Sequence, residues 1–166
     1  MIALSGEYRS QSGFSLLELL VVLVLIAVTT SLVVVNFRHD AAHQVEREAR
    51  RFTALVEQLC QESIIRGRVL AVTQDNNSGY RFVELLADAW QPISGDDLLR
   101  PRQLPEDMRL FITAPETTTD EGTVYLVCRP DGQLPTFTSR FIQNTIRYRV
   151  ETTELQQLEI VDETTG

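Results

Sequence analysis

The sequence has 166 residues, with 23 acidic and 15 Lys or Arg side chains, and its formal net charge at pH 7 is −8. A chain this acidic does not attract polyanions over long range, which disfavours a general role in binding nucleic acid. Its length allows one domain with a modest core beside the apolar N-terminal segment.

The first predicted element is an apolar helix near the N-terminus. From Phe14 to Phe37 the sequence runs for 24 residues with a single ionisable side chain, Glu18, and about 20 apolar residues are enough to cross a bilayer. A carboxylate within such a helix costs at least about 2.5 kcal/mol, so it needs a physical reason. A cut after Gly13 would leave a free ammonium on Phe14, one helical turn from Glu18. The two charges would then neutralise each other, within a chain or between neighbouring chains.

This pattern resembles the class III signal of type IV pilins and type II secretion pseudopilins. The match is the segment from Gly13 to Glu18, G-F-S-L-L-E, followed by the apolar run. The resemblance implies that a prepilin peptidase cuts between Gly13 and Phe14 and N-methylates Phe14. It also implies a role for Glu18 in assembly. The expected parts are a leader over residues 1–13, a transmembrane helix over residues 14–37 and a periplasmic domain over residues 38–166.

Two other kinds of apolar segment fit less well. An ordinary cleaved secretory signal has an apolar region of about 7–15 residues, which this run exceeds. An uncut membrane anchor tolerates the length but does not favour a carboxylate at position 18.

The helix is predicted to continue to about residue 66. Apolar residues recur there at spacings of three and four, typical of a helix that packs one face on a core, while charged residues such as Glu48 lie mostly off this stripe. Gly67 is a suitable stop because glycine readily adopts the left-handed conformation that ends many helices. The stripe consists of Val45, Ala49, Phe52, Val56, Leu59 and Ser63, widened by Leu55, Cys60 and Ile64.

The rest of the chain predicts antiparallel strands. Two β-prone segments flank a turn cluster at residues 75–79 and form a predicted hairpin. The clearest alternation places Ile146, Tyr148 and Val150 on one face. One long helix followed by strands indicates an α+β arrangement in which a sheet covers the helix, and the resemblance implies the pilin-like fold. The predicted strands are residues 68–74, 80–87, 109–113, 123–129, 145–150 and a last one through Leu158 and Ile160.

Three further motifs resemble the minor pseudopilin H family of type II secretion systems. In chain order they are G-Y-R-F from Gly79, the Trp90–Pro105 segment with its W-Q-P and L-R-x-R-x-L-P patterns, and P-D-G from Pro130. The Trp90–Pro105 segment holds three prolines and is predicted as a crossover rather than a regular element. The P-D-G sequence predicts a type I turn that starts at Arg129.

The chain has two cysteines, Cys60 and Cys128, in no metal-like spacing. In an oxidising periplasm they could form a disulfide. The interpretation that the sequence favours is two separate small buried side chains. A disulfide needs Cα atoms within about 7 Å, and the spacing in sequence carries no information on that distance.

The residues that could bind a metal or take part in catalysis also have ordinary structural interpretations. His39 and His43 are four residues apart, like a metal-ligand pair, but a solvated helix face is the preferred interpretation. Asp96-Asp97 and the Asp120-Glu121-Gly122 stretch are interpreted as acidic turns, because neither has the spaced ligands of a calcium loop. Both histidines lie close to the membrane segment, so the domain has no histidine base. We therefore expect no enzyme activity, no metal and no other cofactor.

One late basic cluster, Arg140, Arg147 and Arg149, is followed by an acidic tail. From Glu151 to Gly166 there are five acidic residues and no basic one. The tail is either a solvated terminal strand or a face for a partner subunit. The arginine cluster supports a second hypothesis, a minor pilin of a DNA-uptake pilus, in which phosphate contacts would make binding strongly salt-dependent.

The leading hypothesis is a structural subunit. The resemblance implies a minor pseudopilin of the type II secretion system, anchored in the inner membrane, which joins the tip of a pseudopilus that helps to export folded proteins across the outer membrane. Its implied partners are the major and other minor pseudopilins, the prepilin peptidase and the inner-membrane assembly platform. No nucleic acid is expected. A third hypothesis is a membrane-anchored periplasmic enzyme, which an uncut N-terminus would favour.

Overall fold

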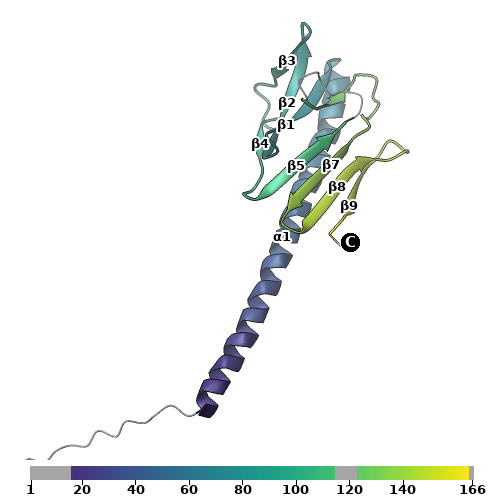
Figure 1. Cartoon of the computed structure of the whole chain (residues 1–166). Helices are drawn as coiled ribbons and strands as arrows, with labels where there is room; N and C mark the ends of the chain where they lie inside the picture. Colours follow the sequence, from purple (N-terminus) through teal and green to yellow (C-terminus); the bar gives the residue numbers. More distant parts are fainter. Residues whose placement is uncertain (1–15, 115–122, 165–166) are drawn as a thin grey trace, which may run out of the picture. The chain divides into compact units, whose positions relative to one another are not determined.

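The computed structural model describes residues 16–114 and 123–164, without the side chains of residues 29–39. The chain divides into two compact units, Met1–His39 and Asp40–Gly166, and each is considered by itself. The described part of the first unit is helix. The second unit contains the end of helix α1 and strands β1 to β9 (Figure 1).

Helix α1 is formed by Leu16–Arg66 and packs its predicted stripe on the core of the second unit. Two side chains differ from the prediction. Ile64 is 49% exposed, whereas Glu48 is only 8% exposed although it was expected off the stripe. The stripe residues Val45, Ala49, Phe52, Val56, Leu59 and Ser63 are each 0% exposed, and Leu55 and Cys60 are also buried.

Gly67 ends the helix, as the sequence predicts. Its φ is +62°. The N–H of Gly67 donates to the carbonyl of Ile64 (3.3 Å), and the N–H of Arg68 donates to the carbonyl of Ser63 (3.2 Å). These are the two hydrogen bonds of a Schellman motif, and they direct the chain into the first strand.

The first sheet has the antiparallel order β3-β2-β1-β6, and β4 is a second partner of β2. The predicted hairpin is confirmed as β1 and β2. The Trp90–Pro105 segment was predicted to be irregular, but most of β3 and all of β4 lie in it. These strands are too short to show a period in sequence. The bounds are β1 Leu70–Asp75, β2 Gly79–Leu86, β3 Ala89–Pro92, β4 Arg102–Gln103 and β6 Tyr125–Cys128.

The second sheet has the antiparallel order β5-β7-β8-β9. Strand β7 is missing from the sequence prediction. Its inward positions are Ser139 and Phe141, both 0% exposed, so a buried serine hides the apolar alternation. The bounds are β5 Met108–Thr113, β7 Thr138–Gln143, β8 Ile146–Thr152 and β9 Leu158–Asp162.

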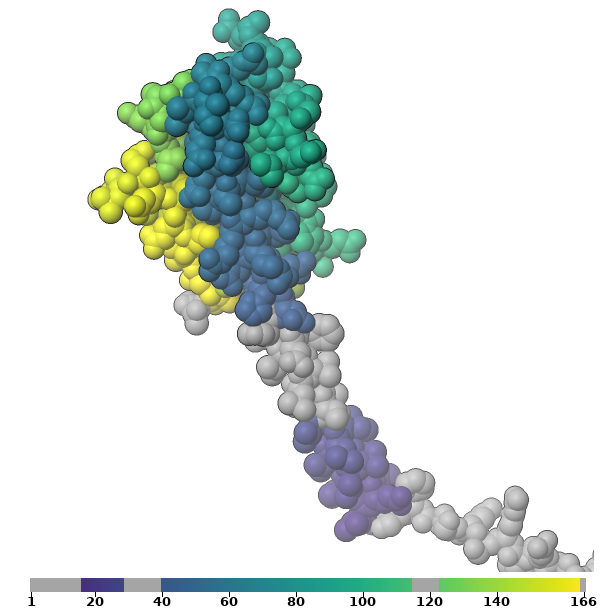
Figure 2. All heavy atoms as spheres, turned by 180° about the vertical axis from the view of Figure 1, so that it is seen from behind, coloured from purple at the N-terminus to yellow at the C-terminus, as the bar shows by residue number. Residues whose placement is uncertain are grey.

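Both sheets contribute to one core against α1, and Phe52 lies at its centre. Its ring makes edge-on contacts with Tyr80 of the first sheet, at 5.1 Å between centroids, and with Phe141 of the second, at 5.5 Å. Figure 2 shows the segment of α1 after residue 40 (blue) beside the C-terminal strands (yellow). The predicted α+β fold, a helix covered by antiparallel sheet, is confirmed.

The two sheets are connected beside the β1–β2 turn. The N–H of Leu110 donates to the carbonyl of Asn77 (2.9 Å), and the N–H of Ile112 donates to Oε1 of Gln74 (3.0 Å). Nε2 of Gln74 in turn donates to Oδ1 of Asn77 (2.8 Å). The turn therefore also satisfies backbone groups along the outer edge of β5.

Candidate functional site

The predicted assembly residue Glu18 lies in the first turn of α1. Its side chain is exposed, and the apolar side chains of residues 16–26 around it are between 45% and 90% exposed. A carboxylate in the first turn is favoured by the positive end of the helix dipole. Gly13 and Phe14, the residues of the predicted cut, lie outside the described residues. The pairing of Glu18 with a Phe14 ammonium therefore stays a prediction.

The apolar surface of residues 16–26 needs a cover, since exposed apolar patches of this kind mark contacts with lipid or with other proteins. Within the described residues, no helix has the length and hydropathy of a membrane span. The predicted span over residues 14–37 includes positions outside the description and stays a prediction.

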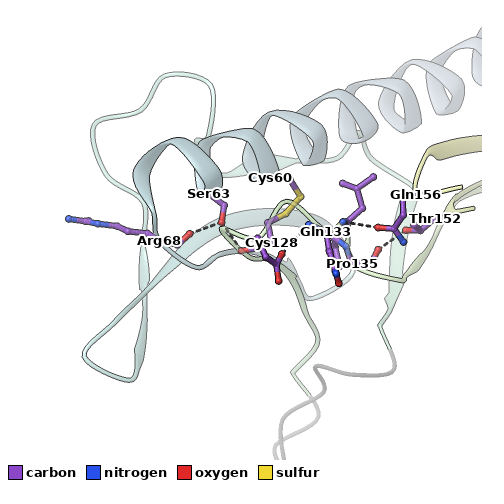
Figure 3. The surroundings of a disulfide bond; sticks show 10 residues. Cys60, Ser63, Arg68, Cys128, Gln133, Pro135, Thr152 and Gln156 are labelled. Carbon is purple, nitrogen blue, oxygen red and sulfur yellow. Dashed lines mark hydrogen bonds between the residues drawn. A yellow bond between two sulfur atoms is a disulfide. The ribbon is translucent and has the colours of Figure 1, made fainter. Parts of the chain in front are cut away.

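A disulfide joins the end of α1 to β6, the outer strand of the first sheet (Figure 3). Cys60 and Cys128 are bonded, with their Cα atoms 4.9 Å apart. The interpretation favoured from sequence, two separate buried cysteines, is therefore wrong in one respect: both are buried, but as a pair. The two cysteines are separated by 68 positions in sequence. Cys128 returns to the helix because β6 pairs with β1, which is a long-range relationship.

Ser63 lies beside this disulfide and explains why a serine belongs to the apolar stripe. Its hydroxyl lies 2.6 Å from the carbonyl oxygen of Arg68 and 2.9 Å from that of Cys128, and its single hydrogen can serve one of them at a time. The hydroxyl thus supplies a donor to buried carbonyl groups where the helix end, β1 and β6 meet.

The segment after β6 is held by a turn and by the β8–β9 connection. The N–H of Gly132 donates to the carbonyl of Arg129 (3.3 Å), which confirms the predicted turn. Further along, the N–H of Leu134 donates to Oε1 of Gln156 (3.0 Å), and the hydroxyl of Thr152 donates to the carbonyl of Pro135 (2.6 Å). Figure 3 shows the contacts of Gln156 and Thr152 next to the disulfide.

Two of the sequence motifs meet in space. G-Y-R-F supplies Gly79 and Tyr80 at the start of β2, and L-R-x-R-x-L-P supplies Arg102 and Gln103 of β4, which pair with them. A Cβ atom on Gly79 would lie 2.3 Å from the carbonyl oxygen of Arg102. Only glycine therefore allows β4 to lie this close to β2.

Asp96 anchors the start of the loop that connects β3 to β4. Its Oδ1 accepts hydrogen bonds from the N–H groups of Leu98 (3.0 Å) and Leu99 (3.1 Å), and its Oδ2 accepts one from Arg66 (2.8 Å), which also pairs with Glu62. The Leu99 N–H lowers the pKa of Asp96 most, partial burial opposes the shift, and Arg66 lowers the pKa further. With both oxygens engaged by groups of the chain, Asp96 anchors the loop.

Tyr80 and Glu48 bring polar groups into the core near β4. Burial raises the pKa of Tyr80 to about 12, the nearby Glu48 carboxylate adds to the rise, and Arg102 and Arg51 act in the opposite direction. The phenolic oxygen of Tyr80 has no hydrogen-bond partner among the described atoms. Glu48 is paired with Arg51 at 2.8 Å. Tyr80 is therefore neutral at physiological pH, and its ring packs edge-on against that of Phe52.

The late arginine cluster is paired with acids of the tail. Glu163 lies 2.8 Å from Nε of Arg149 and 3.6 Å from Nε of Arg140. Arg149 also pairs with Glu151. Two of the three arginines thus have carboxylate neighbours, which lowers the positive potential that phosphate binding would need. The geometry does not favour the DNA-uptake hypothesis.

Among the residues that the structure describes, the candidate metal ligands are not grouped into a site. His43 is 51% exposed, and its Nδ1 lies 3.7 Å from Oε2 of Glu46. The His39 side chain and the Asp120–Gly122 stretch lie outside the described residues. In the part of the chain that the structure describes, no three His, Cys, Asp or Glu side chains are placed to hold a metal.

Comparison with known proteins finds matches both to the N-terminal segment and to most of the chain. Residues 8–34 match the family model of the prokaryotic N-terminal methylation motif. The chain is 30% identical to type II secretion system protein H of Aeromonas hydrophila, over 76% of this chain and 78% of that protein. It is 31% identical to type II secretion system protein H of Escherichia coli K12, over 78% of this chain and 79% of that protein.

Solved structures show the same fold. One structure of the minor pseudopilin EpsH from the type 2 secretion system of Vibrio cholerae matches with a TM-score of 0.59 at 22% identity, over 72% of this chain and 97% of that one. A second EpsH structure matches with a TM-score of 0.61 at 20% identity, over 73% and 95%. The predicted pilin-like fold is confirmed.

Proposed function

The chain belongs to the type II secretion system protein H family, and from this premise we propose that it is a minor pseudopilin at the tip of a pseudopilus. In this role it helps to drive folded proteins across the outer membrane. The observation that carries the proposal is Glu18, a carboxylate in the first turn of a helix whose surrounding side chains are exposed and apolar. Such a helix needs neighbours that cover its surface and neutralise its charge.

The proposed mechanism starts with processing of the N-terminus. A prepilin peptidase in the inner membrane cuts between Gly13 and Phe14 and methylates the new amine. Residues 14–37 remain in the membrane, and the domain from residue 38 lies in the periplasm. The charge of Glu18 then has a partner, the Phe14 ammonium of its own or a neighbouring chain.

Assembly follows from packing of the apolar helices. Extraction of residues 14–37 from lipid is offset when these helices bundle with those of other pseudopilins, because packing contacts replace lipid contacts. A Glu18 that meets a neighbour's ammonium avoids the cost of an unpaired charge in a low-dielectric bundle. The partners are the major subunit, the other minor subunits and the inner-membrane assembly platform.

A deletion and complementation experiment tests the proposal. Loss of the gene in its own bacterium should abolish or strongly reduce the enzyme activity of folded exoproteins in the medium, and the intact gene should restore it. DNA uptake, measured in the same strains, should be unchanged. Normal secretion together with lost DNA uptake would contradict the proposal in favour of a pilus role.

A further inference from the structure

One outer edge of the second sheet is formed by β9, which, among the described residues, pairs with β8 on one side and with no strand on the other (Figure 1). We propose that this edge is a docking site for an extended, basic segment of a partner protein, which adds a strand to the sheet. The inference concerns a surface that the proposed membrane and assembly roles do not use.

The hydrogen-bond pattern shows which backbone groups of β9 point outward. The N–H of Glu163 donates to the carbonyl of Arg147 (2.9 Å), and the N–H of Thr153 donates to the carbonyl of Gln157 (2.8 Å). In an antiparallel ladder only every second residue directs its N–H and C=O at the neighbouring strand. Residues 159 and 161 therefore bond to β8, whereas the backbone groups of residues 158, 160 and 162 point away from it.

The side chains of β9 define the chemistry of the edge. Leu158 and Ile160 are half-buried against the core, and Glu159 and Asp162 are exposed. Asp162 lies on the same face of the sheet as Leu158 and Ile160 and accepts a hydrogen bond from the N–H of Thr164 (2.8 Å), whereas Glu159 lies on the opposite face. No ion pair engages Glu159 in the described part of the chain, whereas the neighbouring Glu163 is paired with Arg149. A partner strand with Arg or Lys on the face of Glu159, and with apolar residues on the face of Leu158 and Ile160, matches this pattern.

The same charges exclude a second copy of β9 as the occupant. Two acidic edges placed side by side would bring like charges together, which is destabilising between paired strands. The edge also has no proline and no lysine within Leu158–Asp162, which are common ways to block strand addition. Pairing of this edge with a second copy of β9 is therefore disfavoured, whereas pairing with a basic strand is favoured.

The outer edge of β5 is less available. The N–H groups of Leu110 and Ile112 are already satisfied by Asn77 and Gln74 of the neighbouring sheet. Strand addition gains most where main-chain groups are unsatisfied. Among the described residues, β9 is thus the edge of the second sheet whose outward backbone groups have no partner strand.

Amide hydrogen exchange on the full chain in detergent micelles tests the site with a defined probe, a short peptide in which Arg alternates with Val. At low salt the peptide should slow exchange at the amide of Ile160 by about tenfold or more, because a strand bond protects it. The amide of Val161, already bonded to β8, should change little. A peptide with Glu in place of Arg should give no protection.

Matched variants separate the backbone from the side chains. Ile160→Pro removes the outward N–H and should abolish binding, whereas Ile160→Ala keeps it and should bind. Glu159→Gln should weaken binding severalfold, whereas Glu57→Gln on the exposed face of α1 should not. If Ile160→Pro fails to fold, the two peptides on the unaltered chain decide the question. Equal protection by both peptides, no protection by either, or protection that depends only on the concentration of the chain itself would overturn the proposal.

Discussion

Gly79 lies against the backbone of Arg102, so closely that a Cβ atom on the glycine would be 2.3 Å from the arginine carbonyl oxygen. The two residues are far apart in sequence, and their contact joins the start of β2 to β4. Two motifs that are separate in the sequence, G-Y-R-F and L-R-x-R-x-L-P, thus meet at one contact in the fold.

Gly79→Ala should destabilise the protein by roughly 1–3 kcal/mol, the usual cost of overpacking, because β4 would have to separate from β2. Chemical denaturation measures the change. Arg102→Ala is the matched control, since it removes the side chain and its bond to Leu98 but keeps the backbone that the new Cβ would meet. It should cost only about 1 kcal/mol. A Gly79→Ala protein as stable as the unaltered chain would contradict the close contact.

Removal of the disulfide should destabilise the second unit strongly. For a closed loop of 68 residues, the loop-closure relation gives about 4 kcal/mol. The unaltered chain should lose this stability in reducing buffer, and a Cys60→Ala, Cys128→Ala double variant should already lack it. Reducing agent should then have no effect on the double variant. Intact mass under non-reducing conditions should be lower by two hydrogens, and two free thiols in oxidised, folded protein would contradict the bond.

Asp96 should contribute to acid sensitivity. Its pKa in the folded protein lies below the ordinary value of 3.8, so its contribution is present above that value and is lost as pH falls through the lower folded pKa. Asp96→Asn should reduce stability by up to about 1 kcal/mol at pH 7, where Arg66 loses its charged partner. The difference from the unaltered chain should shrink near pH 3. Asp97→Asn, at the exposed neighbour, is the control and should show little effect at either pH.

Helical periodicity predicted α1 and its buried stripe because that signal is local and repeats over many residues. The strands with clear alternation were predicted for the same reason. β7 was not, because Ser139 replaces an apolar residue at an inward position and is buried. The pairing of Cys60 with Cys128 depends on strand order, and Glu48 comes close to Tyr80 only because β2 packs against α1. Neither relationship is encoded in neighbouring residues.

Glu18→Ala should leave cutting at Gly13 unaffected but should impair assembly, because the Phe14 ammonium would then lack its carboxylate. The measurement is the fraction of chain that is crosslinked to the major pseudopilin, together with exoprotein activity in the medium. Asp40→Asn is the control, since it removes an exposed acid outside the apolar segment. Normal secretion by Glu18→Ala would contradict the pairing role.

The central claim is that a new N-terminal amine forms next to Glu18 and that the chain assembles through it. The most direct test is the intact mass, with N-terminal sequencing, of the chain isolated from its own membranes. The account predicts a mature protein that begins with N-methylated Phe14. A functional chain that retains Met1 through Gly13 would contradict it.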